Sequence, residues 1–348
     1  MSHSNPSFGD KRAIEAWHAL PRAPYQTIDV LRLTPTIGAD VHGVDLSKDL
    51  SDVQFAEVRR AMSENLVVAF RGQTLSREQH KAFVRRFGAL HQHTLSKIRA
   101  GEQEHDPEIL AWRTNKDSQY TAGEGWHSDV SCDEHPISGS FLHVTRLPEQ
   151  GGGDTAFTNM ILAYESLSPA YQAFLEKLTA VHDGALPWTI GYGVKPEAGK
   201  TFPTAEHPVV AIHPATGRKF LYVNSGFTSH IPQLSRDESA SVLQHLFRHI
   251  EKSVHFQVRV RWEPGTLLFW DNWATQHRAI WDYFPEERWG ERVSALAVAR
   301  QQAAAWWVHG SFLNRAGCSG SDHEQKRTNT AVFCTPIRGV LFLFQRQI

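Results

Sequence analysis

The chain has 348 residues, of which 41% are hydrophobic, and this is enough for a sizeable core in one large domain or two smaller ones. Its 36 basic residues nearly balance its 37 acidic ones, so the charge gives no reason to expect nucleic acid or an anionic membrane as a partner. The 3 cysteines are too few for a disulfide framework or a thiolate zinc site. Since no apolar signal segment or run of about 18 apolar residues is present, we expect a cytoplasmic protein.

The first part of the chain, residues 1–26, is polar and interrupted by prolines, and we expect a flexible N-terminal arm there. Helices are predicted to begin at Ser51, Ser76 and Ser235. Each of these serines is followed three residues later by Gln or Glu, as in a capping box. Behind the third serine, apolar residues recur at helical spacing up to Ile250, which indicates a helix with one buried face.

Most other apolar segments are typical of strands. Leu66–Phe70, Phe141–Leu147 and Gly265–Asn272 are short and rich in β-branched and aromatic residues, and His207–Phe227 contains a turn between two such runs, as in a hairpin. Because strands mostly follow strands, the predicted fold class is mainly β with flanking helices, in a barrel or a sandwich. We place the main domain at residues 27–302. Residues 303–348 are predicted to be an atypical C-terminal tail.

The stretch EGWHSDVSC holds the first candidate metal ligands, His127 and Asp129. Residues two apart point to the same face of a strand, so both side chains are expected at one strand end. His277, in FWDNWATQH, is the candidate third ligand from a distant strand. Two histidines and one carboxylate form the facial triad of non-haem Fe(II) oxygenases. An isolated histidine is more often a hydrogen-bonded core residue, so the triad needs support from other residues.

A possible carboxylate-binding group follows the third ligand. Arg288 lies 11 residues after His277, and Arg292 lies four residues further on. A guanidinium group near the metal suits bidentate capture of a carboxylate, such as that of 2-oxoglutarate. Thr155 follows a glycine-rich turn at residues 151–153, where its hydroxyl is placed to make a second hydrogen bond to the same carboxylate. Surface arginines and a routine hairpin turn would produce the same pattern without any ligand.

The motifs together resemble a known family. WHSDVS, GGDTAFTN, HPATGRKFLYVNSGFT and FQVRVRWEPGTLLFWDNWATQH look like the taurine dioxygenase family of Fe(II)- and 2-oxoglutarate-dependent oxygenases. The resemblance runs in unbroken order from about Val30 to Ala297. It implies a double-stranded β-helix (jelly roll) core and a reaction that uses Fe(II), 2-oxoglutarate and O2.

The resemblance also assigns roles to individual residues. The implied iron ligands are His127, Asp129 and His277. The implied co-substrate contacts are Thr155, Arg288 and Arg292, with Arg292 also at the substrate end. The implied substrate contacts are His93, Val130, Trp188, Phe227 and Arg292.

The substrate pocket departs from that of the taurine enzyme. His93 matches a sulfonate-binding histidine, but Ser96 and Gly123 replace a tyrosine and an asparagine, and Trp188 replaces a phenylalanine. We therefore expect a small anionic organic substrate, an alkyl or aryl sulfonate or sulfate ester, that is hydroxylated with release of succinate and CO2. A homo-oligomer is also expected.

Three alternatives remain open on the sequence. An aryloxyalkanoate dioxygenase of the same family would bind its carboxylate through His93 and Arg292. A zinc-dependent hydrolase would use the same two histidines and aspartate, although no HExxH pairing is present. A non-catalytic jelly-roll binding protein is the third. Neither of the last two needs the carboxylate clamp formed by Arg288 and Thr155.

Overall fold

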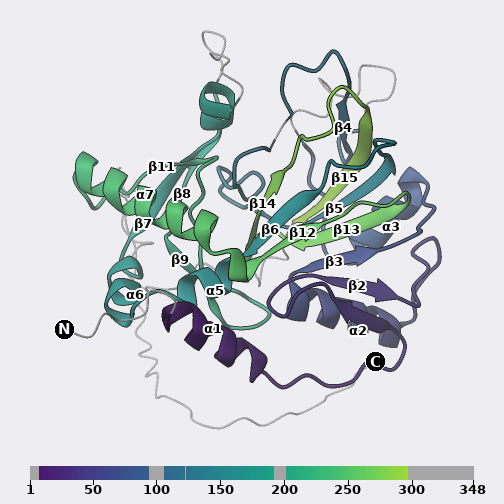
Figure 1. Cartoon of the computed structure of the whole chain (residues 1–348), viewed down its shortest axis with the longest axis horizontal. Helices are drawn as coiled ribbons and strands as arrows, with labels where there is room; N and C mark the ends of the chain where they lie inside the picture. The colour runs from purple at the N-terminus through teal and green to yellow at the C-terminus, as the bar shows by residue number, and fades with distance from the viewer. Residues whose placement is uncertain (1–7, 94–105, 122, 192–200, 297–348) are drawn as a thin grey trace, which may run out of the picture. The chain divides into compact units, whose positions relative to one another are not determined.

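The computed structural model describes residues 8–93, 106–121, 123–191 and 201–296 (Figure 1). The predicted tail at 303–348 and Ser96 lie outside these ranges. Six α-helices are described: α1 (Phe8–His18), α2 (Asp52–Asn65), α3 (Arg77–Arg85), α5 (Met160–Glu165), α6 (Pro169–Leu175) and α7 (Arg236–Lys252). Two shorter helices are η1 (Pro187–Gly191) and η2 (Val254–Phe256). In the described part of the chain, no helix is long and apolar enough to cross a membrane.

Strands dominate the described core and form four sheets. The largest sheet has seven strands in the order β1 (Asp29–Arg32), β2 (Ala39–His42), β3 (Val67–Phe70), β13 (Thr266–Asp271), β5 (Ile137–Arg146), β15 (Arg288–Leu296) and β4 (Leu110–Thr114). A three-stranded sheet has the order β12 (Gln257–Val260), β6 (Thr155–Asn159) and β14 (Thr275–Ala279). Another has the order β11 (Thr228–His230), β7 (Thr179–Asp183) and β8 (Thr204–Pro208). The fourth pairs β10 (Lys219–Leu221) with β9 (Val210–Ile212). The predicted mainly β class with flanking helices is confirmed.

The central strands of the large sheet are buried on both faces. On β3, Val68 and Phe70 pack into one apolar cluster with α2 and α3, whereas Val67 and Ala69 pack into a second cluster that includes Phe157 of β6. Side chains alternate between the two faces of a strand, so a strand covered on both sides needs an almost continuous apolar run. This explains the run that predicted β3.

The predicted helix starts and the hairpin agree with the structure. Ser76 and Ser235 form complete capping boxes at α3 and α7, whereas Ser51 at α2 accepts only the hydrogen bond from the Gln54 amide. The predicted hairpin is β9–β10, in which Val210 pairs with Leu221.

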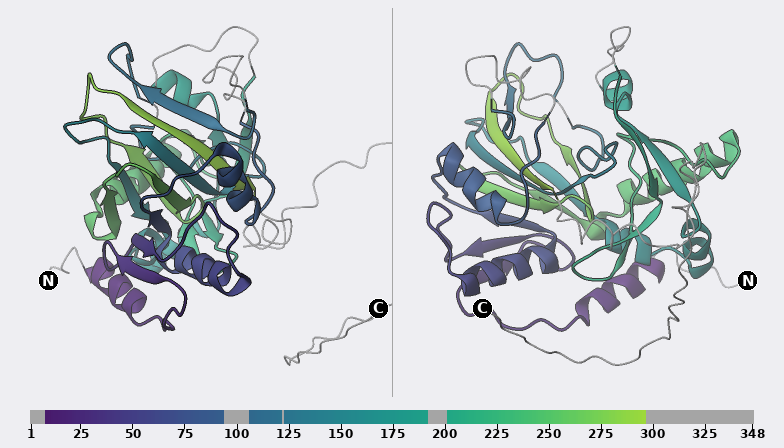
Figure 2. Two further views of the ribbon diagram at one scale, coloured as in Figure 1. Left: turned by 90° about the vertical axis from the view of Figure 1, so that its right-hand side faces the viewer. Right: turned by 180° about the vertical axis from the view of Figure 1, so that it is seen from behind.

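The N-terminal segment differs from the predicted flexible arm. Residues 8–18 form α1, in which Ala13 and Trp17 are each only 2% exposed. Arg12 donates hydrogen bonds to the carbonyls of Glu165, the last residue of α5, and of Leu167 just after it. The Arg218 guanidinium lies 4.5 Å from the centre of the Trp17 ring. The views in Figure 2 show α1 beside α5. The polar composition hid this helix because only two of its side chains are deeply buried.

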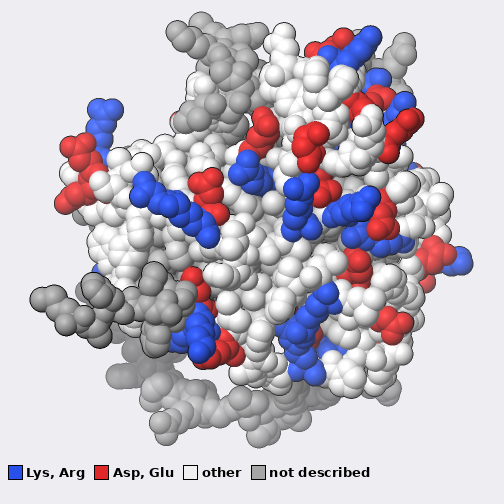
Figure 3. All heavy atoms as spheres, viewed as in Figure 1, with Lys and Arg blue, Asp and Glu red and all other residues white. Residues whose placement is uncertain are grey.

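Charges on the face in Figure 3 are mixed, with acidic and basic side chains interspersed rather than separated by sign. Oppositely charged side chains also pair at the surface, as Arg85 does with Glu108 at 2.8 Å. Such mixing agrees with the near-zero net charge, and on this face no large field of one sign attracts a polyanion.

Candidate metal and co-substrate site

One cavity of about 740 Å³ brings together every residue that the sequence proposed for the site. Its lining includes His93, His127, Asp129, Val130, Thr155, Trp188, Phe227, His277, Arg288 and Arg292. These residues come from the large sheet, from the β12-β6-β14 sheet and from the connecting segments.

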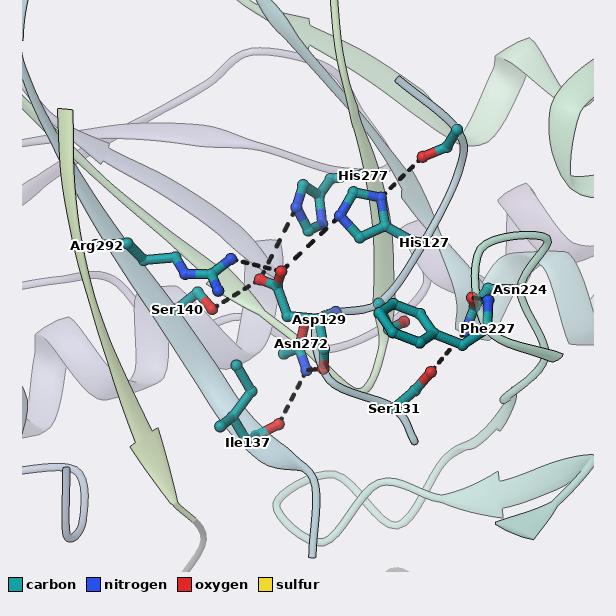
Figure 4. Close-up of polar contacts among 12 residues, drawn as sticks. His127, Asp129, Ser131, Ile137, Ser140, Asn224, Phe227, Asn272, His277 and Arg292 are labelled. Atoms are coloured by element: carbon teal, nitrogen blue, oxygen red, sulfur yellow. Dashed lines mark hydrogen bonds and ion pairs between the residues drawn. The ribbon is translucent and has the colours of Figure 1, made fainter. Parts of the chain in front are cut away.

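Three potential metal ligands converge at one place in this cavity (Figure 4). One ligand atom from each of His127, Asp129 and His277 lies within 4.8 Å of the other two. Nε2 of His127 is 3.8 Å from Oδ1 of Asp129, and Nε2 of His277 is 3.9 Å from Oδ2. Two nitrogen donors and one oxygen donor on one side of a shared centre match the donor set of a facial triad.

The backbone around the first two ligands differs from the predicted strand end. His127 forms an isolated bridge with His277, whose amide donates to the His127 carbonyl at 2.9 Å and whose carbonyl accepts at 3.1 Å. Asp129 lies in the turn that follows. Ser128 Oγ donates to the Thr275 carbonyl at 3.0 Å, so side chains continue the pairing where the strand pattern stops.

The Asp129 carboxylate has two hydrogen-bond donors of its own. Ser140 Oγ donates to Oδ2 at 3.1 Å, and the Arg292 guanidinium donates to Oδ1 at 2.5 Å (Figure 4). Burial alone would raise the pKa of this carboxyl, but the charge and the hydrogen bond of Arg292 outweigh burial and hold the pKa well below its usual range. Asp129 is therefore ionised, as a metal ligand must be.

Both histidines are held in the neutral form. Burial lowers the pKa of both His127 and His277. His127 Nδ1 lies 2.8 Å from the Gly125 carbonyl, which can only accept, so Nδ1 donates and the lone pair is on Nε2. The His277 ring packs beside Trp270 and Phe157, with ring centres 4.8 Å and 5.8 Å away.

Arg288, in the lining of the same cavity, has two guanidinium nitrogens without an acceptor in the part of the chain that the structure describes. Nε and Nη2 of Arg288 are buried and have no hydrogen-bond partner among the described residues. Burial lowers the pKa of Arg288, an effect that Tyr283 and Asp154 partly oppose. Buried guanidinium groups are normally paired, so these two nitrogens fit an anionic ligand such as the carboxylate of 2-oxoglutarate.

Thr155 lies at the start of β6, in the lining of the same cavity. Its Oγ1 accepts a hydrogen bond from Trp262 Nε1 at 3.0 Å, which leaves its own proton available to a ligand. The Trp262 ring centre is 5.1 Å from the Arg288 guanidinium, so one indole contacts both proposed clamp residues.

The glycine-rich turn has a packing role beside Arg288. Gly153 has φ +71°, and a Cβ atom there would lie 3.0 Å from Arg288 Cδ and 3.1 Å from Tyr283 Cε1. Its amide donates to Asp282 Oδ1 at 2.8 Å. A larger residue at 153 would therefore displace the arginine that the turn supports.

The substrate end is bounded by aromatic side chains. The rings of Trp188 and Phe202 are 6.1 Å apart, and the Phe227 ring is 6.5 Å from that of His127. Gly123, where the taurine enzyme has an asparagine, has φ +86°, and a Cβ there would approach the His127 ring to 2.9 Å. Gly123 therefore leaves room in front of the first histidine.

Several residues of the site were not predicted from the sequence. Asn272, Ser140, Trp262 and Tyr283 each contact a predicted site residue. Two of them, Trp262 and Asn272, lie within a quoted motif, but their roles were not predicted because these depend on contacts between residues far apart in the chain.

The fold and the site define a jelly-roll oxygenase of the non-haem Fe(II) class, with a 2-His-1-carboxylate donor set in the cavity that Arg288 and Thr155 also line. The chain belongs to the taurine catabolism dioxygenase TauD, TfdA family, which matches residues 29–294. It is an Fe(II)- and 2-oxoglutarate-dependent dioxygenase that uses O2. Membership decides against the zinc hydrolase and the non-catalytic binding protein.

Three characterised relatives are similar over most of the chain. An alpha-ketoglutarate-dependent sulfonate dioxygenase of Saccharomyces cerevisiae is 34% identical over 74% of this chain and 63% of its own length. An alpha-ketoglutarate-dependent sulfate ester dioxygenase of Pseudomonas putida is 30% identical over 79% of this chain and 92% of its own length. An alpha-ketoglutarate-dependent 2,4-dichlorophenoxyacetate dioxygenase of Cupriavidus pinatubonensis is 32% identical over 71% and 90%.

A solved structure supports the same fold. The crystal structure of a taurine dioxygenase from Burkholderia xenovorans has a TM-score of 0.67 and 34% identity, and it covers 78% of this chain and 90% of its own. The predicted jelly-roll core is thereby confirmed.

Proposed function

We propose that His127, Asp129 and His277 hold Fe(II), and that Arg288 and Thr155 bind the distal carboxylate of 2-oxoglutarate. The observation that carries this proposal is the pair of buried Arg288 nitrogens without an acceptor in the cavity that also holds the three ligands. An ionised Asp129 and two neutral histidines supply the electron pairs that a divalent metal needs.

When bound, Fe(II) together with 2-oxoglutarate and O2 supplies the oxidising chemistry that hydroxylates a substrate C–H bond. The residues of this chain orient the ligands and keep water out. Arg288 and Thr155 fix the far end of the co-substrate, and the Trp188 and Phe227 rings shield the reacting end from solvent.

We further propose an anionic substrate with an alkyl or aryl group, carried as a sulfonate or a sulfate ester. Arg292 and His93 line the cavity and supply cationic or hydrogen-bonding groups for the anion, whereas Trp188, Phe202 and Phe227 supply apolar surface. A volume of about 740 Å³ lies within the range of roughly 300–1,000 Å³ that suits drug-sized ligands, and so leaves room for such a group beside the co-substrate. The sulfonate and sulfate ester relatives support this class.

Product release tests the proposal. Hydroxylation of a CH2 group that bears the sulfonate sulfur or the ester oxygen replaces one C–H bond with C–OH. The unstable adduct then breaks its C–S or C–O bond to give an aldehyde and sulfite or sulfate, so the aryl compounds tested carry their aryl group on such a CH2. Succinate, sulfite and sulfate are measured with Fe(II), 2-oxoglutarate and O2 across alkyl and aryl sulfonates, sulfate esters and taurine. We expect succinate equal to released sulfite or sulfate for the alkyl or aryl compounds, and less turnover of taurine.

An aryloxyalkanoate is the second candidate, because His93 and Arg292 suit a carboxylate equally and a relative is named for such a substrate. Phenol release coupled to succinate, without sulfite or sulfate, would favour it. If only uncharged or zwitterionic compounds stimulate succinate formation, both anionic classes are wrong. The homo-oligomer and the cytoplasmic location stay predictions, which light scattering and fractionation of the native host would test.

A further inference from the structure

The segment formed by β13, the turn after it and β14 contacts all three proposed metal ligands, although the two strands belong to different sheets. His277 lies on β14, and its backbone pairs with that of His127. Asn272, in the turn between the two strands, reaches the backbone of Asp129 (Figure 4). This one segment of the chain therefore carries the second histidine and holds the other two ligands through their main chain.

The Asn272 side chain bonds both the amide and the carbonyl of Asp129, as the backbone of a neighbouring strand would. Its Oδ1 accepts from the Asp129 amide at 2.8 Å, and its Nδ2 donates to the Asp129 carbonyl at 2.9 Å. The same Nδ2 donates to the Ile137 carbonyl at 3.1 Å. The side chain is 0% exposed. A turn residue lacks the ladder bonds that fix a strand residue, and this carboxamide replaces them for Asp129.

The orientation of the Asp129 carboxylate depends on these hydrogen bonds with Asn272. Arg292 and Ser140 donate hydrogen bonds to the carboxylate oxygens. These bonds can persist if the backbone of the turn shifts, so they do not fix the backbone of Asp129. Only a fixed main chain keeps the same carboxylate directed at Nε2 of both histidines. We propose that Asn272 is a positioning residue, whose carboxamide sets the Asp129 backbone so that the carboxylate completes the metal site.

The inference concerns the metal site alone, so its test needs no substrate and no 2-oxoglutarate. Asn272→Ala and Asn272→Ser are compared with the wild-type chain by titration with Co(II), an air-stable stand-in for Fe(II). The readouts are the Co(II) Kd, the ligand-field absorption of the bound ion, and the unfolding midpoint in chelator.

Asn159→Ala is a matched control. Asn159 is also 0% exposed, and it also makes three hydrogen bonds to backbone groups, from the Ile161 and Leu162 amides and to the Thr36 carbonyl. It does not contact any of the three ligand side chains in the hydrogen bonds described. The two alanine variants therefore lose the same number of buried bonds, but only one loses a contact with Asp129.

We expect Asn272→Ala and Asn272→Ser to weaken Co(II) binding by roughly 10- to 100-fold and to change the ligand-field spectrum, as residues that orient metal ligands do. Asn159→Ala should lower the unfolding midpoint while it keeps the wild-type Kd and spectrum. The proposal is overturned if the Asn272 variants keep the wild-type Co(II) Kd and ligand-field spectrum, or if Asn159→Ala loses as much Co(II) affinity as they do. It is also overturned if neither Asn272 variant folds while Asn159→Ala does, because Asn272 would then be structural only.

Discussion

Asp129 has a second role as the partner of a buried cation. Arg292 is 5% exposed and pairs with its carboxylate, so Asp129→Ala leaves a buried charge without a partner. We expect the unfolding free energy, measured by urea in the presence of chelator, to fall by about 3–5 kcal/mol. Metal binding should be lost as well.

The double variant Asp129→Ala/Arg292→Met separates the two effects. Removing the cation as well as its partner should restore most of the lost stability, because no uncompensated charge remains. Co(II) binding should stay absent. An Asp129→Ala protein as stable as the wild type would show that the ion pair contributes little, and one that binds Co(II) normally would remove Asp129 from the ligand set.

Arg288 gives a prediction for the co-substrate. Arg288→Ala should raise the Kd for 2-oxoglutarate more than about thirtyfold, since truncating one partner of a buried charged pair costs roughly 2–5 kcal/mol. Arg288→Lys should recover only part of the affinity, because an ammonium group cannot reproduce the guanidinium fork. The measurement is calorimetric titration of the metal-loaded protein.

Arg113→Ala is the control for this experiment. Arg113 lines the same cavity, but its side chain is 55% exposed and pairs with Glu287. Exposed pairs contribute up to about 1 kcal/mol, so the Kd should change by no more than about fivefold. Equal losses in Arg113→Ala and Arg288→Ala would indicate general charge attraction instead of a clamp.

At the scale of elements, a substitution in α1 tests whether the N-terminal segment is a packed helix or a flexible arm. Trp17 is 2% exposed and belongs to the core cluster that includes α5. Trp17→Ala should therefore cost about 3–5 kcal/mol of unfolding free energy. Leu20→Ala, where the side chain is 39% exposed, should stay within about 0.5 kcal/mol. Urea unfolding of both variants checks the comparison, and a neutral Trp17→Ala would favour the arm.

Elements with local signals were predictable from the sequence. Ser76 and Ser235 begin helices because each side chain bonds a backbone amide three residues away, and β3 is a strand because its apolar run is covered on both faces. The proposed metal ligands could be named as candidates from their residue types, and the resemblance that covers most of the chain assigned them as a set. Spacing alone placed His127 and Asp129 on a strand, and the structure places Asp129 in a turn.

Contacts between distant residues were beyond the sequence. The hydrogen bonds between Asn272 and Asp129 join residues 143 positions apart. No local pattern in WDN distinguishes Asn272 from an ordinary asparagine in a turn. The same holds for Arg292, which was expected at the substrate end but also pairs with Asp129. Such contacts depend on how the large sheet packs against the β12-β6-β14 sheet, and packing is decided by the whole core.

For the molecule as a whole, buried neutral histidines predict sensitivity to acid. Burial lowers the pKa of His80 and His182 to about 3 and that of His207 to about 4. An unfolded histidine has a pKa near 6.5, so between these values the unfolded chain binds protons that the folded chain does not. Stability is therefore retained above pH 6.5 and lost as the pH falls toward 4. Each such histidine contributes a slope of up to about 1.4 kcal/mol per pH unit.

His80→Gln tests this account on one of the three. His80 is 2% exposed, and glutamine keeps a hydrogen-bond donor but cannot take up a proton. Unfolding free energies from urea are measured between pH 6 and pH 5, above the range in which most carboxyl groups titrate. The three histidines should contribute roughly two to three protons to the slope of the unfolding free energy against pH in the wild type, and the variant should lose close to one of them, whatever the change in stability at pH 7. An unchanged slope would mean that His80 is protonated in the folded protein, which its burial beside His143 argues against.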